Sequence, residues 1–149
     1  MIFVKNGAEA GPCIIGVGSA QGPDSLGLLL CERLREESPE IGGDWHLCTV
    51  PAQLPALMAD HAAVVLLDAL AGDGAGPRLL TPDDLADEPP LSSHGFGVGE
   101  ALALARALGH LPEVCHVIGL PIAPDGDPEA RARTLLPRVR DLLRVLFGH

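Results

Sequence analysis

The segment AVVLLDAL, residues Ala63–Leu70, is a continuous apolar run that carries one carboxylate, Asp68. Runs of this kind, rich in β-branched residues, are typical of strands buried on both faces of a parallel sheet. A carboxylate at the end of such a strand must be paired, hydrogen-bonded or bound to a metal, because leaving it unpaired costs several kcal/mol. The segment therefore predicts a central strand that ends near a functional Asp68. The alternative is a structural Asp68 that binds backbone N–H groups of the turn Ala69–Gly72.

Strand and helix patterns alternate on both sides of this segment. We expect the other strands at Cys13–Ser19, Trp45–Val50, Arg78–Thr81 (a brief edge strand) and Cys115–Ile122. We expect helices at about Ser25–Glu37, Pro51–Asp60, Gly97–Gly109 and Pro128–Phe147, the last kinked by Pro137, and an acidic loop at Pro82–Ser93. The alternation predicts an α/β three-layer sandwich, with a mostly parallel five-stranded sheet and helices on both faces. With no repeat or linker, residues 1–149 form a single domain.

Composition excludes several classes of function. The net charge of -10 would repel a phosphate backbone, so we expect no nucleic-acid partner. No apolar run approaches the ~20 residues that span a bilayer, so we expect no membrane partner. The apolar start Met1–Val4 is too short for a signal peptide, and Lys5 follows it instead of preceding it. We therefore expect a cytoplasmic protein.

Cysteine and most histidine positions show no metal-binding spacing. The four cysteines are far apart, without a C-x-x-C pair, and each lies in an apolar stretch, which predicts buried, inert thiols at Cys13, Cys31, Cys48 and Cys115. Five of the six histidines also lack ligand spacing and are expected to have no metal role: His46, His61, His110, His116 and His149.

Parallel α/β sheets bind ligands outside the carboxyl ends of their strands, and three metal-capable side chains are expected there. Asp24 follows the first strand in the glycine-rich turn Gly16–Gly27, Asp68 ends the central strand, and His94 lies in LSSHGFGVGE before the third helix. Asp24 could instead be a helix N-cap, and His94 a loop histidine without a ligand role.

Three common sites are not supported. The glycines at 16, 18 and 22 do not have the dinucleotide-binding spacing G-x-G-x-x-G, and the second strand ends in Thr49 and Val50 instead of an acid. A phosphate-binding P-loop needs a Gly-Lys pair, whereas Lys5 is the only lysine. No G-x-S-x-G segment is present, so the hydrolase mechanism built on that motif is excluded.

Three motifs occur in an order that resembles the nickel–iron hydrogenase maturation endopeptidases. The first is the glycine-rich turn with Gly16, Gly18, Ser19, Pro23, Asp24 and Gly27, the second is VVLLDAL with Asp68, and the third is SSHGFGVGEAL with His94. The chain departs from the family pattern at Ser19, which replaces the usual Asn in a turn about one residue short, and two other departures stand out. Pro23 replaces the first acid of an acidic pair, and CTVP (Cys48–Pro51) stands where the family has a D-G-G-T-like segment that is thought to help handle substrate.

The resemblance implies an endopeptidase, described in this family as aspartic-type, that removes a C-terminal extension from the hydrogenase large-subunit precursor after nickel insertion. It implies that Asp24, Asp68 and His94 contact the precursor's nickel, which acts as a recognition element, and that Gly16, Gly18 and Ser93 contact the substrate. Two carboxylates and an imidazole suit a borderline divalent ion. No separate nucleophile is visible and no organic cofactor is implied, so the catalytic group is unknown, and activation of water by the same metal stays open.

Two alternatives stay open. A non-cleaving hydrogenase accessory protein would keep the fold and the metal contact, and both departures from the family motifs favour it. An α/β nucleotide-binding module is the other.

Overall fold

The computed structural model describes residues 12–72, 74, 76–88 and 97–148. Its five strands are β1 (Cys13–Val17), β2 (Asp44–Cys48), β3 (Ala63–Ala71), β4 (Arg78–Leu80) and β5 (Val114–Ile122). Its helices are η1 (Pro23–Ser25), α2 (Leu26–Glu37), η2 (Pro51–Gln53), α3 (Leu54–Met58), α4 (Pro82–Ala86), α5 (Val98–Leu108) and α6 (Pro128–Phe147). Within these described ranges, no helix has the length and apolar character needed to span a bilayer.

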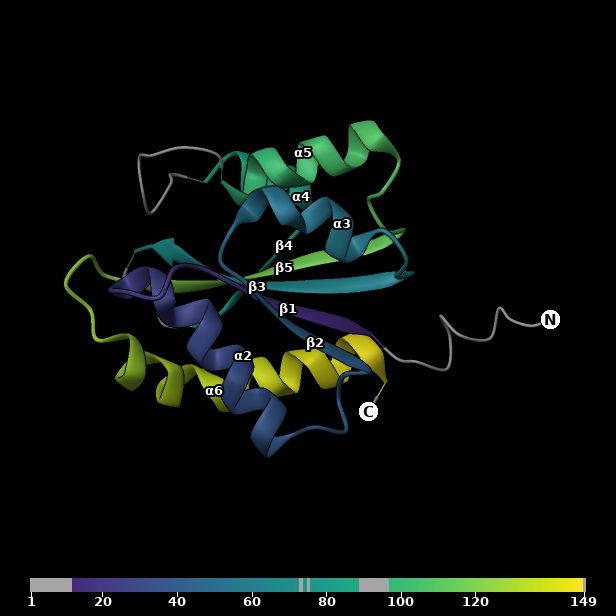
Figure 1. The fold of residues 1–149 in the computed structure, drawn as a ribbon. Helices are drawn as coiled ribbons and strands as arrows, with labels where there is room; N and C mark the ends of the chain where they lie inside the picture. The colour runs from purple at the N-terminus through teal and green to yellow at the C-terminus, as the bar shows by residue number, and fades with distance from the viewer. Residues whose placement is uncertain (1–11, 73, 75, 89–96, 149) are drawn as a thin grey trace.

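The strands form one sheet in the order β2-β1-β3-β5-β4 (Figure 1). Neighbouring strands are parallel from β2 to β5, and only β4 runs antiparallel to its neighbour β5. The first and third strands along the chain are therefore direct neighbours. Their carboxyl ends meet at one edge of the sheet, where α/β proteins place ligands.

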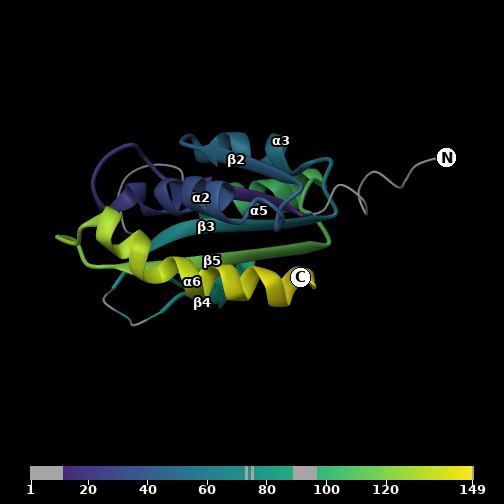
Figure 2. The same ribbon diagram turned by 90° about the horizontal axis from the view of Figure 1, so that it is seen from below.

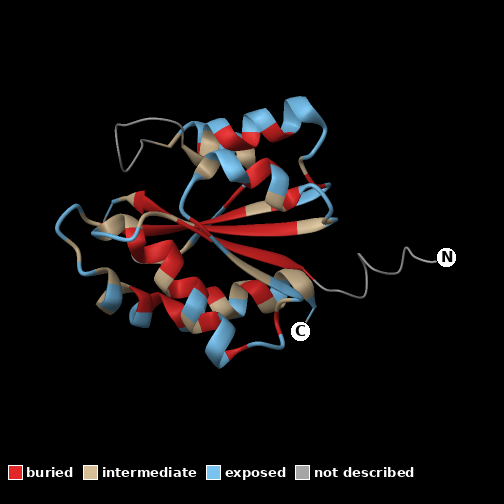
Figure 3. Cartoon of the chain, viewed as in Figure 1, coloured by how far each residue is buried: buried red, intermediate tan, exposed pale blue. Residues whose placement is uncertain are grey.

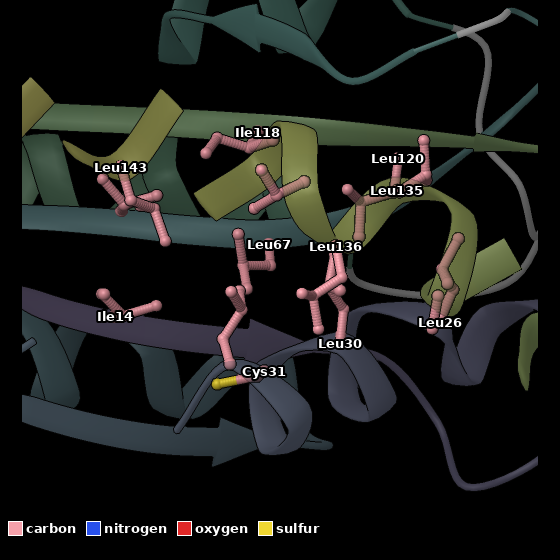
Figure 4. Packing of buried hydrophobic residues seen from close by; sticks show 14 of the residues in the cluster. Ile14, Leu26, Leu30, Cys31, Leu67, Ile118, Leu120, Leu135, Leu136 and Leu143 are labelled. Atoms are coloured by element: carbon pink, nitrogen blue, oxygen red, sulfur yellow. The ribbon is translucent and has the colours of Figure 1, made fainter. Parts of the chain in front are cut away.

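Helices cover both faces of this sheet, as Figures 1 and 2 show: α2 and α6 lie on one face, and α3, α4 and α5 on the other. Each face has its own apolar core. In the first, Leu30 of α2 and Leu136 of α6 pack with Leu67 of β3 (Figure 4). In the second, Leu54 and Leu102 pack against the opposite face of the same strands. The predicted three-layer α/β sandwich is confirmed.

Burial follows the layers closely (Figure 3). All five residues of β1 are buried, as are six of the nine residues of β3 and seven of the nine residues of β5. The edge strand β2 instead has Asp44 and Leu47 exposed. All four cysteines are free and buried, as predicted. The longest helix, α6, runs without interruption through Pro137, and its inner face includes Leu135, Val139 and Leu143.

The expected acidic loop at Pro82–Ser93 is wrong in its first part, because Pro82–Ala86 forms helix α4. Thr81 caps this helix: its hydroxyl accepts a hydrogen bond from the Asp84 N–H at 3.0 Å, and the Asp84 carboxylate accepts one from the Thr81 N–H at 3.0 Å. This reciprocal pair satisfies two N–H groups that a short helix otherwise leaves open. The sequence T-P-D-D carried this signal, which the acidic and proline-rich composition obscured. Residues 89–93 lie outside the described residues.

Candidate functional site at the carboxyl ends of β1 and β3

Asp68 lies inside β3 rather than at its end, which corrects the expected strand boundary. The strand continues to Ala71, paired throughout with β5, whereas β1 ends at Val17, which pairs with Asp68. Asp68 is therefore level with the point where its neighbour β1 stops. Beyond Asp68, β3 has no β1 residue beside it and is paired only with β5. The Asp68 carboxyl group therefore lies beside the turn that leaves β1.

The electrostatic environment of Asp68 is unfavourable to its charge. Burial and, to a smaller extent, the nearby Asp24 carboxylate raise the pKa of the Asp68 carboxyl to about 7, while the Ala69 backbone N–H acts in the opposite direction. The effect of Asp24 shows that the two carboxyl groups share one region. A pair of carboxylates in a desolvated place is stabilised by a cation, which removes the cost of ionising both.

The turn after β1 places Asp24 in this region. The Ser19 N–H donates to the Asp24 carbonyl at 3.2 Å, and the Ser25 hydroxyl donates to the Gly22 carbonyl at 2.7 Å. The turn folds back so closely that a Cβ at Gly18 would lie 2.0 Å from the Asp24 carbonyl oxygen. Gly18 is thus required by the shape of the turn.

Helix α2 then crosses directly over the carboxyl ends of β1 and β3. A Cβ at Gly27 would lie 2.4 Å from the carbonyl oxygens of both Val17 and Leu67. A Cβ at Gly16 would lie 2.5 Å from the Cβ of Cys31 on the same helix. Glycine at these positions lets the first turns of α2 lie against the backbone of the sheet, and this contact fixes Asp24 next to Asp68.

Asp24 does not cap a helix. It lies within the 3₁₀ turn η1, whose N-cap is Gly22, and α2 begins after Ser25; neither terminus has a side-chain capping hydrogen bond. The capping explanation of Asp24 is therefore wrong. The half-buried Asp24 side chain is placed by the turn, and its carboxylate acts on Asp68.

His94 and Ser93 lie outside the described residues, so their roles stay predictions. The helix that follows them is described: α5 begins at Val98, after Gly97 donates its N–H to the Glu100 carboxylate at 3.1 Å. In Figure 1, α5 begins on the left, the side toward which β1 runs. The start of α5 thus lies at the same end of the molecule as Asp24 and Asp68.

In the sequence analysis, Gly27 has only a place in the first motif and no structural role. Gly27 sets how closely α2 approaches the sheet, and so where Asp24 lies. Its signal was a glycine in the first turn of an otherwise leucine-rich helix, where glycine lowers helix stability and often reflects a close contact.

Comparisons with known proteins identify the fold. No protein-family model matches the sequence, and no curated protein gives a significant match. Solved structures do match. The solution structure of an endopeptidase from Escherichia coli has a TM-score of 0.68 at 19% identity, covering 90% of this chain and 92% of that chain. The hydrogenase maturating endopeptidase HybD from E. coli has a TM-score of 0.64 at 19% identity, with 90% and 92% covered.

An archaeal structure extends the similarity. The [NiFe] hydrogenase maturation protease HycI from Thermococcus kodakarensis has a TM-score of 0.63 at 22% identity, covering 91% of this chain and 93% of that chain. The chain therefore has the fold of the hydrogenase maturation endopeptidases over nearly its whole length. The resemblance inferred from the three sequence motifs is confirmed at the level of the fold.

Proposed function

We propose that this protein is an endopeptidase of hydrogenase maturation, which removes the C-terminal extension of a nickel-loaded large-subunit precursor. The observation that carries the proposal is the pairing of Asp24 with Asp68 at the carboxyl ends of β1 and β3, on a fold shared with endopeptidases of that function. The fold alone would suit many activities. The two acidic groups at its ligand-binding edge support this activity over the others.

In this proposal the nickel ion belongs to the precursor. The carboxylates of Asp24 and Asp68, with the imidazole of His94, approach the ion from the protein side and so distinguish a loaded precursor from an empty one. A divalent cation favours the ionised form of Asp68, whose pKa is otherwise raised to about 7. Recognition of the loaded precursor therefore changes the charge state of this carboxyl group.

The two glycines Gly16 and Gly18, expected from the family resemblance to contact the substrate, also have roles in packing within the protein. Both are explained by close packing within the protein: Gly16 against α2 and Gly18 against the Asp24 carbonyl. Gly18 is half-buried and its N–H already donates to the Cys48 carbonyl at 3.1 Å, so its carbonyl oxygen is the group it offers to a bound peptide, whereas Gly16 is buried. We propose that Gly18 contacts the precursor backbone and that Gly16 acts through the position of α2.

A second candidate function is a non-cleaving accessory protein that binds the loaded precursor. The observation that favours it is the segment after β2, where the chain has Cys48–Pro51 in place of a D-G-G-T-like sequence. In the structure the Cys48 thiol donates to the Val50 carbonyl at 3.1 Å, and the 3₁₀ helix η2 begins at Pro51. This closed turn presents no carboxylate to a substrate.

The deciding experiment is incubation of the protein with a nickel-loaded large-subunit precursor and, separately, with the metal-free precursor. Intact-mass measurement then reports C-terminal truncation, and co-purification reports binding. The endopeptidase proposal expects truncation of the loaded precursor only. Binding without truncation would establish the accessory function, and absence of both binding and truncation would exclude both candidates.

Matched aspartate variants test the site itself. Asp68→Asn should abolish truncation, because it removes the charge that faces Asp24 while keeping the side-chain volume. Asp83→Asn is the control: its carboxylate is 82% exposed in α4 and pairs with Arg106 at 3.0 Å. Equal loss of truncation in both variants would contradict a role for the Asp24–Asp68 pair.

A further inference from the structure

Three side chains with metal-binding atoms gather at the opposite end of the sheet. The thiol sulfur of Cys13 and a ring nitrogen from each of His46 and His61 lie within 4.8 Å of one another. Cys13 is fully buried and the two histidines are half-buried, so the cluster is reached from solvent past the imidazoles. These residues were expected to be an inert thiol and two histidines without a metal role.

Strand pairing creates the cluster. Cys13 is the first residue of β1 and pairs with Asp44, the first residue of β2. His46 lies two residues further along β2, so it projects from the same face as Asp44. His61 comes from the turn after α3, where its backbone N–H donates to the Met58 carbonyl at 3.1 Å. Residues from three separate segments thus converge, which no local sequence spacing reveals.

Asp44 provides a fourth donor beside these three. Its Oδ2 lies 3.7 Å from His61 Nε2, and its side chain is half exposed. The rings of His46 and His61 have centroids 6.4 Å apart and are inclined by 65°, so they meet edge to face rather than stacking.

We propose that Cys13, His46 and His61 bind a structural Zn²⁺ ion, with Asp44 as the fourth ligand. A thiolate, two imidazoles and a carboxylate are all ligands that Zn²⁺ takes in tetrahedral sites. Bond lengths of about 2.0–2.3 Å place tetrahedral ligand atoms about 3.4–3.6 Å apart. The donor atoms of Cys13, His46 and His61 lie within 4.8 Å of one another, so rotation of the half-buried imidazoles has to bring them closer by no more than about 1.5 Å.

The free thiol is protonated in the absence of the ion. Burial raises the pKa of Cys13 to about 12, and the Asp44 carboxylate contributes to the rise. A bound divalent cation reverses the effect of such surroundings, because its charge favours the thiolate over the thiol. On binding, the sulfur–hydrogen bond breaks, the proton passes to solvent, and the sulfur electron pair forms the bond to zinc.

This site is separate from the Asp24–Asp68 pair. Cys13 begins β1, whereas Asp68 pairs with Val17 at its end, and the four residue steps from Cys13 to Val17 span about 13 Å. The ion would connect the edge strand β2 to β1 and to the turn that enters β3. Its function is therefore to stabilise the exposed edge of the sheet.

Cobalt is the probe for this site, because Co²⁺ replaces Zn²⁺ and absorbs light. Titration with CoCl₂ in an Asp68→Asn background, which weakens the other carboxylate pair, should give intense visible bands of tetrahedral cobalt and a near-ultraviolet thiolate-to-cobalt band. Added Zn²⁺ should displace the cobalt and raise Tm, since an ion that binds only the folded state stabilises it.

Two matched pairs of variants complete the test. Cys13→Ser should remove the thiolate band, whereas Cys115→Ser, which changes another free thiol of the same apolar core, should keep it. His46→Gln should remove the Tm increase caused by Zn²⁺, whereas His110→Gln, at an exposed position, should keep it. Absence of a thiolate band in the parent protein, or its persistence in Cys13→Ser, would overturn the proposal. If Cys13→Ser does not fold, His46→Gln tests the site in its place, because His46 is half-buried on the edge strand.

Discussion

The carboxylate of Asp24 raises the pKa of the Asp68 carboxyl, although the two residues come from a turn and a strand far apart in the sequence. This electrostatic interaction depends on β1 lying next to β3 and on α2 crossing over their carboxyl ends at Gly27. Burial is the larger cause of the raised pKa and the Asp24 charge the smaller one. The two causes are separable by experiment, because a substitution of Asp24 removes only the second.

Replacing Asp24 with Asn should lower the pKa of Asp68 without returning it to the ordinary value of an aspartate. The neighbouring negative charge is lost, whereas the desolvation of the carboxyl group remains. Titration of carboxyl carbons by nuclear magnetic resonance, with the metal-free protein, measures this shift directly. An unchanged Asp68 titration would mean that the two groups do not interact in solution.

Replacing Asp68 with Asn should stabilise the metal-free protein at neutral and alkaline pH. The pKa of Asp68 is about 7 in the folded protein, above its value in the unfolded chain. At pH values between the two, the folded protein keeps a proton that the unfolded chain has released. Wild-type stability from this group is therefore greatest below about pH 4 and falls as pH rises to about 7. The raised pKa of this half-buried group corresponds to a loss of about 2–4 kcal/mol in the free energy of unfolding of the wild type.

The measurement is urea unfolding of both proteins at a series of pH values. Other titrating groups affect wild type and Asp68→Asn alike, so the difference between the two unfolding free energies isolates Asp68. That difference should grow between about pH 4 and pH 7 and stay constant above. A difference independent of pH would show that Asp68 titrates normally in the folded state.

Replacing Gly27 with Ala should destabilise the protein, because the new Cβ would lie 2.4 Å from two backbone carbonyl oxygens. Backbone atoms of a central sheet do not move aside easily, and overpacking of this kind costs about 1–3 kcal/mol or more. Gly99→Ala is the control in helix α5, where nothing lies within 4 Å of the new Cβ, and it should stabilise by about 0.5–1 kcal/mol. Thermal unfolding of both variants checks the contrast.

The Gly27 variant also tests how the acidic pair is positioned. If α2 moves away from the sheet to relieve the contact, Asp24 moves with it, and the pKa of Asp68 should fall toward its ordinary value. A Gly27→Ala protein with wild-type stability would show that α2 does not lie against Val17 and Leu67 in solution.

The central elements were predictable from sequence because their patterns have one physical explanation. The short apolar run before Asp68, rich in β-branched residues, favours a strand covered on both faces, and the leucines of α2 and α6 repeat at helical spacing. Strand ends were less predictable. β3 continues past Asp68 because its later residues pair with β5, a long-range partner that the local sequence does not specify.

Two other features depended on information that lies outside local patterns. Helix α4 is held by the Thr81–Asp84 capping box and by an ion pair in which Arg78 donates to Glu88 at 2.7 and 2.8 Å. Its composition alone resembles a loop. The cluster of Cys13, His46 and His61 arises only when β1 pairs with β2, so spacing rules for metal sites could not identify it.

Replacing His94 with Ala should abolish retention of a divalent ion by the Asp24–Asp68 pair while leaving Tm nearly unchanged. Without the imidazole the proposed site keeps only two of its three ligands, and a substitution in the loop that the sequence predicts at this position should change stability by only about 0.5 kcal/mol. The measurement is equilibrium dialysis against Ni²⁺, followed by metal analysis of the protein. It is made in the Cys13→Ser background so that the cysteine–histidine cluster does not contribute.

His110→Ala is the matched control for this loss, since His110 is exposed just beyond the end of α5. It should retain nickel like the parent protein. If His94→Ala also retains nickel, the imidazole is not a ligand, and the site reduces to the two carboxylates. If His94→Ala loses nickel together with several degrees of Tm, then His94 supports the fold, and the loss of metal follows from the loss of structure. Only loss of nickel at constant Tm identifies His94 as the third ligand.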